Sequence, residues 1–84
     1  MNIYVGNLPI TATEADLRNL FREFGRVASV KILTDMETGQ SKGFGFVEMD
    51  DHTDGRRAIK KLNDMQFMDQ VIQVSEAIPQ PGKK

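Results

Sequence analysis

The chain has 84 residues, which suffices for one domain with a thin core and excludes a second. It has no cysteine and no apolar run near the roughly 18 residues of a membrane span, so we expect no disulfide, no membrane partner and a reducing compartment such as the cytoplasm. Eleven basic and twelve acidic residues give a formal net charge of −1, which excludes strong steering by the whole-molecule field.

The first part of the chain predicts a strand, a helix and a second strand. Residues 2–6 alternate in polarity, and Pro9, which lacks an amide hydrogen, ends this strand. Thr13 and Asp16 can form a capping box, and Gly25 is a natural C-cap for the helix that follows. Its apolar stripe has spacing i, i+3, i+4 and i+7: Leu17, Leu20, Phe21 and Phe24. Residues 27–34 predict the second strand, with three inward residues: Val27, Val30 and Ile32.

Residues 35–41 carry turn formers and predict a flexible hairpin loop that leads into a strand over 42–49. Its alternation is inverted, because Phe44 and Phe46 share a face with Lys42 and Glu48. The opposite face carries small and apolar residues: Gly43, Gly45, Val47 and Met49. We expect the charged face to point to solvent, which would expose an aromatic pair and make it a candidate binding surface.

The second part predicts a helix over about 52–62, with possible caps at 50–53. Its buried stripe is Gly55, Ala58, Ile59 and Leu62. Residues 65–68 form a connector in which Phe67 folds back onto the core, and 71–75 form the last strand with Ile72 and Val74 inward. Residues 79–84 predict a disordered tail.

The order βαββαβ predicts an α+β, ferredoxin-like fold in residues 1–78, with a four-stranded antiparallel sheet and both helices on one face. The other face of the sheet stays open. The residues expected there are Tyr4, Lys31, Leu33, Lys42, Phe44, Phe46, Glu48, Val71, Gln73 and Ser75.

Two short motifs resemble those of the RNA-recognition motif (RRM) family. Residues 42–49 match the pattern Lys/Arg-Gly-Phe/Tyr-Gly/Ala-Phe-Val-x-Phe/Tyr at every specified position except the last, where Met49 replaces an aromatic residue. Residues 3–8, Ile-Tyr-Val-Gly-Asn-Leu, are similar to the family's second motif. The resemblance covers nearly the whole chain and extends to small stand-alone RRM proteins of bacteria, including cyanobacteria.

The resemblance implies that the two motif strands lie side by side and that the chain binds single-stranded RNA, with single-stranded DNA as the alternative. By the family's pattern, Tyr4 and Phe44 each stack a base, and Phe46 packs against a ribose pair. Lys42 contacts a phosphate, and Lys31 a phosphate or a base edge. The residues that would contact base edges are Gln73, Ser75, Glu76 and the backbone of Ala77. We expect a monomer without cofactor, metal or small-molecule substrate.

Two departures from the family predict weak binding. Asp69 and Gln70 occupy a turn where the family commonly has Gly and then Arg, and the loop over 35–41 carries Asp35 and Glu37 but no basic residue. With two or three lysine contacts, we expect a dissociation constant no better than micromolar, which corresponds to about 8 kcal/mol.

Three alternatives remain. The first is an RRM-like protein–protein interaction module, but the connector has Met65-Gln66-Phe67 where the peptide-binding subclass has Arg-x-Phe. The second is an enzyme, for which the only histidine, His52, lies in a helix-cap stretch without an evident second ligand or base. The third is a nonspecific single-strand binder or chaperone.

Overall fold

The computed structural model describes residues 1–39 and 41–77, apart from the side chains of Ser41 and Lys42. The tail predicted over 79–84 lies outside the described residues. The helices and strands are β1 (Asn2–Gly6), α1 (Glu14–Arg22), β2 (Val27–Thr34), β3 (Ser41–Met49), α2 (His52–Leu62), β4 (Gln66–Phe67), β5 (Gln70–Val71) and β6 (Gln73–Glu76).

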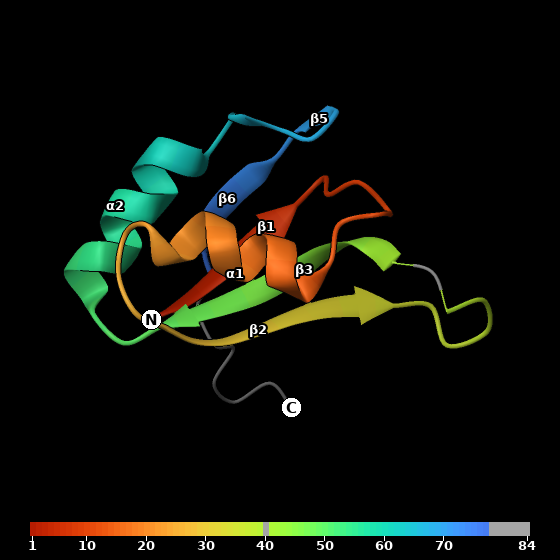
Figure 1. Ribbon diagram of the computed structural model, residues 1–84, viewed down its shortest axis with the longest axis horizontal. Helices are drawn as coiled ribbons and strands as arrows, with labels where there is room; N and C mark the ends of the chain where they lie inside the picture. Colours follow the sequence, from red (N-terminus) through yellow and green to blue (C-terminus); the bar gives the residue numbers. More distant parts are fainter. Residues whose placement is uncertain (40, 78–84) are drawn as a thin grey trace.

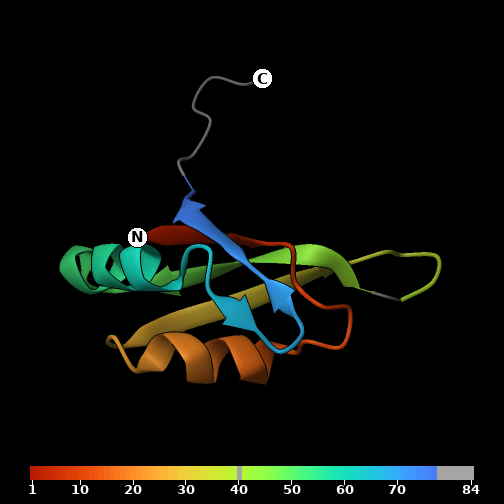
Figure 2. The same cartoon turned by 90° about the horizontal axis from the view of Figure 1, so that it is seen from above.

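Four strands form an antiparallel sheet in the order β2-β3-β1-β6, which places the two motif strands β1 and β3 at its centre. Helix α1 lies in front of the strands in Figure 1, and Figure 2 shows it on one side of the sheet. Residues of both helices join the inward side chains of the sheet in one core, so the predicted ferredoxin-like fold is confirmed.

The core lies between the helices and one face of the sheet. Helix α1 contributes Leu17 and Phe21, and α2 contributes Gly55, Ala58 and Leu62. The strands contribute the residues that alternation placed inward: Ile3, Val5, Val47, Met49 and Val74. Met49 is fully buried, which confirms that an apolar side chain suffices where the family pattern has an aromatic residue.

Helix α1 begins as predicted and ends earlier. The Thr13 hydroxyl accepts from the Asp16 amide at 3.1 Å, and the Asp16 carboxylate accepts from the Thr13 amide at 3.0 Å, which completes the capping box. The helix ends at Arg22 with Glu23 at its C-cap, so Gly25 lies beyond the cap and the prediction of Gly25 as C-cap is wrong. A β-carbon at Gly25 would collide with the Asp54 carboxylate, so the glycine instead lets α2 approach this turn.

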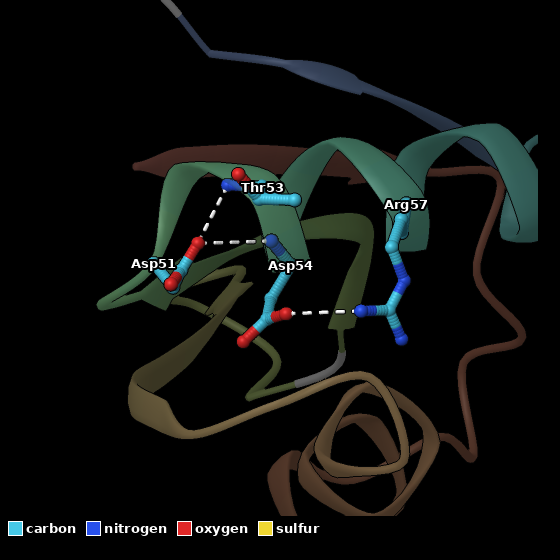
Figure 3. A network of polar contacts seen from close by, with 4 residues as sticks. All are labelled: Asp51, Thr53, Asp54 and Arg57. Carbon is cyan, nitrogen blue, oxygen red and sulfur yellow. Dashed lines mark hydrogen bonds and ion pairs between the residues drawn. The ribbon is translucent and has the colours of Figure 1, made fainter.

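Helix α2 begins at an aspartate cap (Figure 3). The Asp51 carboxylate accepts from the amides of Thr53 at 2.7 Å and Asp54 at 3.2 Å. One turn on, Arg57 donates to the Asp54 carboxylate at 3.1 Å. Within α2, a β-carbon on Gly55 would collide with the Met1 side chain. The glycine therefore allows close contact between this helix and the residue before β1.

We expect Asp51→Ala to lower the free energy of unfolding by about 0.5–2 kcal/mol, because two amides of the first turn would lose their acceptor. Urea denaturation followed by circular dichroism measures the change. Asp50→Ala removes the same charge next to the cap and should stay within about 0.5 kcal/mol of the parent. Equal losses in both variants would show that charge, and not capping, accounts for the effect.

The end of the chain differs from its prediction. Residues 71–75 do not form one strand, because β5 pairs with β4 in a separate two-stranded sheet and β6 begins only at Gln73. Between them, the amide of Ile72 donates to the Met65 carbonyl at 3.0 Å, and its carbonyl accepts from the Asp64 amide at 2.9 Å. The backbone at Ile72 therefore pairs with the connector after α2. Val71 leaves the open face of the main sheet, and Phe67 packs on the core as predicted.

Both outer edges of the sheet are partly covered by side chains. On β2, the Ile32 amide donates to the Glu14 carboxylate at 3.3 Å, and the register shifts twice along the strand. On β6, the Val74 amide donates to the Asn63 side chain at 2.9 Å. Such obstacles hinder pairing with a second chain.

Candidate nucleic-acid interface

The open face of the sheet is an array of side chains in rows that cross the strands. The central row, here called the ring row, runs from β2 to β6 as Lys31, Phe46, Tyr4 and Ser75, which are direct partners across the sheet. On one side of it, Phe44, Gly6 and Gln73 form the next row. On the other side lies the polar row, made of Ser29, Glu48 and Asn2.

The three rings of this face form one cluster. The Tyr4 centroid lies 6.0 Å from that of Phe44 and 5.9 Å from that of Phe46, and the two phenylalanine centroids are 6.4 Å apart. Their planes are inclined to one another by 35° to 90°. Each ring is half-buried, on the face opposite the core residues Val5 and Val47. The predicted aromatic cluster is therefore present on the open face, but its rings are half-buried and not fully exposed.

Two glycines shape this cluster. A β-carbon on Gly6 would lie 2.5 Å from the Tyr4 hydroxyl oxygen and 2.9 Å from two ring carbons, so the Tyr4 ring leans along β1 over a residue without a side chain. Gly43 has φ of +86°, a conformation that favours glycine, and its carbonyl accepts from the Leu8 amide at 2.8 Å. The start of β3 is thereby tied to the end of β1, next to Phe44.

The two predicted lysine contacts differ in what the structure describes. Lys31 is exposed at the β2 end of the ring row, next to Phe46. Lys42 belongs to β3, but its side chain lies outside the described residues. The remaining charge in these rows is the carboxylate of Glu48, which is exposed and accepts from the Ser29 hydroxyl at 3.3 Å.

The four candidates for contacts to base edges do not all share the ring face. Ser75 and Gln73 do, although the Gln73 amide nitrogen already donates to the Asp64 carboxylate at 3.0 Å. Glu76 pairs with the buried residue Ile3, so its side chain leaves β6 toward the helical side. The amide of Ala77 donates to the Asn2 carbonyl at 2.8 Å and is not available to a base.

Two polar residues of this face were not among the predicted contacts, namely Asn2 and Ser29. Alternation along β1 already placed Asn2 on the same face as Tyr4. Alternation from Lys31 likewise places Ser29 on this face, but its pairing with Glu48 depends on the register in which β2 meets β3. The polar row becomes visible only when the strands are paired.

The described residues offer little for the alternative chemistries. They contain no group of three or more His, Cys, Asp or Glu side chains placed to hold a metal ion. His52 is exposed at the first position of α2. The described helices, of 9 and 11 residues, are too short to cross a membrane.

The comparisons with known proteins agree with this geometry. The family model described as "RNA recognition motif" matches residues 3–73. The "Putative RNA-binding protein RbpE" of Nostoc sp. is 43% identical over 83 residues, which are 99% of this chain and 84% of that protein. A crystal structure of RNA Binding Protein PG1 superposes with a TM-score of 0.92 at 51% identity, over 96% of this chain and 98% of that one. A Sxl-lethal protein/RNA complex superposes with a TM-score of 0.89 at 36% identity, over 96% of this chain and 48% of that one.

Proposed function

Because this chain belongs to the RNA recognition motif family, we propose that it binds single-stranded RNA on the open face of its sheet. The observation that carries the proposal is the cluster of Tyr4, Phe44 and Phe46 on the face that the helices leave uncovered. Unpaired bases have flat π-faces, and stacking on aromatic side chains is how sheets of this kind hold them. The relatives named as RNA-binding proteins, and the relative in complex with RNA, support the same class of partner.

Within this face, Tyr4 and Phe44 each stack one base, and Phe46 packs against the sugars between them. Tyr4 and Phe44 suit this role because their planes are inclined by only 35°, so two bases can follow one another across β1 and β3. Phe46 is perpendicular to Phe44 and presents a different surface to the strand. Lys31, and Lys42 at the start of β3, supply the positive charge for phosphates.

Base identity is read beside the rings by Ser75 and by the carbonyl oxygen of the Gln73 side chain, whose amide nitrogen donates to Asp64. Glu76 contributes through its backbone, since its side chain leaves the sheet on the other side. The protein works as a monomer in the cytoplasm, without cofactor or catalysis.

The direct test is a titration of labelled oligonucleotides, as oligo-U, oligo-A, oligo-G and their deoxy equivalents, at low salt. Saturable micromolar binding that is tighter for RNA supports the proposal. Equal affinity for all sequences and for DNA would favour the nonspecific single-strand binder. No binding to any of them would favour the protein–protein interaction module, for which a hollow of about 340 Å³ between α1 and the connector is the candidate surface, lined by Leu20, Phe67 and Met68 among others.

We expect a shallow salt dependence, because two or three phosphates are neutralised. For a single strand, the slope of the logarithm of the association constant against the logarithm of salt concentration should lie between about −1.4 and −2.1. Titrations from 50 to 300 mM salt measure this slope. Lys31→Gln should make it shallower by about 0.7. A much steeper slope would mean that the basic residues of α2 join the site: Arg56, Arg57, Lys60 and Lys61.

A further inference from the structure

The polar row next to the rings has the hydrogen-bonding groups to select one base. We propose that Glu48 and Asn2 bind the Watson–Crick edge of a guanine whose ring is held by the ring row. The inference rests on the proposed function, because it names the base preferred at one position of that site.

The position of the two side chains is set by the strand register. Asn2 and Glu48 are direct partners on β1 and β3, and both are exposed. Side chains of directly opposed residues start with their β-carbons about 5 Å apart. Asn2 lies two residues from Tyr4, and Glu48 two residues from Phe46, a distance of roughly 6.7 Å along each strand. A base that stacks on the ring row can therefore extend one edge over the polar row.

Glu48 is an unexpected residue on a surface for a polyanion, because its carboxylate repels phosphate. Among the described residues, no cation forms an ion pair with it, and its hydrogen bond comes from the Ser29 hydroxyl at 3.3 Å. That bond holds one carboxylate oxygen toward β2 and leaves the other without a donor from the described side chains. When a ligand covers this position, the carboxylate needs donors to replace water. Phosphates offer none, whereas base N–H groups and the ribose 2′-hydroxyl do.

The pairing of Glu48 with Asn2 favours a base edge, and one base in particular. Guanine presents two adjacent donors, its N1–H and its 2-amino group, followed by the acceptor O6. Each carboxylate oxygen has two lone pairs, so both Glu48 oxygens can accept from guanine even though one also accepts from the Ser29 hydroxyl. The Asn2 amide supplies a donor for O6. Adenine and cytosine present an amino group next to a bare ring nitrogen, and uracil presents one N–H between two carbonyls. Each of these three bases offers the carboxylate one donor beside an acceptor, whereas guanine alone offers it two adjacent donors and still leaves an acceptor for the Asn2 amide.

The test compares oligouridines that carry a single central guanosine, adenosine, cytidine or inosine with the all-uridine strand, by fluorescence anisotropy at one salt concentration. We expect the parent protein to bind the guanosine strand about tenfold more tightly than the all-uridine strand. Inosine lacks the 2-amino group and should be intermediate. Glu48→Gln should reduce the guanosine preference to about twofold, while affinity for the all-uridine strand stays equal or rises because a negative charge is gone. Asn2→Ala should reduce the preference severalfold.

The matched control is Glu23→Gln, which removes the same charge at the end of α1 on the other side of the sheet. It should leave the guanosine preference unchanged. The inference is overturned if the parent prefers adenosine or cytidine, if it shows no preference, or if Glu48→Gln retains the full preference for guanosine. Failure of the proposed function looks different: no strand would bind, and the inference would fall with it.

Discussion

We expect replacement of either phenylalanine of the open face by alanine to weaken RNA binding by about 1–3 kcal/mol, or roughly 5- to 150-fold, because the proposed function assigns each ring a contact with the RNA. Both variants, Phe46→Ala and Phe44→Ala, should keep the fold, since these rings lie on the side of the sheet away from the core. The loss of ring–ring contacts costs only about 1 kcal/mol of stability. Anisotropy titration gives the affinity, and urea denaturation gives the stability of the same samples.

Phe44→Tyr is the matched control, because it keeps a ring of the same shape at the same place. It should bind within about threefold of the parent, which is less than 1 kcal/mol. If the alanine variants unfold, the rings belong to the core and not to a binding surface. If they fold and bind RNA as tightly as the parent, the sheet face is not the site.

The opposite result is expected for Phe21→Ala, which removes a fully buried ring from α1. Such truncations cost about 3–5 kcal/mol, because a cavity remains where the ring was packed. Small domains have a total stability of about 5–15 kcal/mol, so this variant should be close to unfolding. Thermal denaturation measures the loss, and affinity per folded molecule should be unchanged.

Met36→Ala provides the comparison, because Met36 is 98% exposed in the turn after β2. Its effect on stability should stay within about 0.5 kcal/mol. If Phe21→Ala were tolerated as well as Met36→Ala, the core between α1 and the sheet would be misidentified. Comparison of Phe21→Ala with Phe44→Ala and Phe46→Ala therefore separates residues that stabilise the fold from residues that bind the RNA.

The sequence alone predicted the parts of this molecule that depend on local periodicity. The inverted alternation of 42–49 placed Phe44 and Phe46 on one face, and the capping pair Thr13 and Asp16 marked the start of α1. Each of these signals involves residues a few positions apart, so no long-range information is needed.

The parts that could not be predicted depend on contacts between distant segments. The interruption between β5 and β6 at Ile72 follows from the backbone hydrogen bonds of Ile72 with Met65 and Asp64, which no local sequence pattern predicts. The pairing of Ser29 with Glu48 depends on the register in which β2 meets β3, which residues close in sequence do not fix. Glu76 is a different case: alternation from Val74 already indicates the helical side, whereas the family resemblance had suggested a contact to a base edge.

The ring cluster also limits how much information one molecule can read. Its ring centroids lie within 6.4 Å of one another, so the proposed stacking would hold two or three nucleotides. A defined triplet recurs by chance about once in 64 nucleotides, so one copy of this domain finds a match many times in any long transcript. Selective binding of a single transcript therefore requires several copies of the domain bound along it, or a second RNA-binding domain linked to the first. The avidity of such an arrangement far exceeds the affinity of one domain.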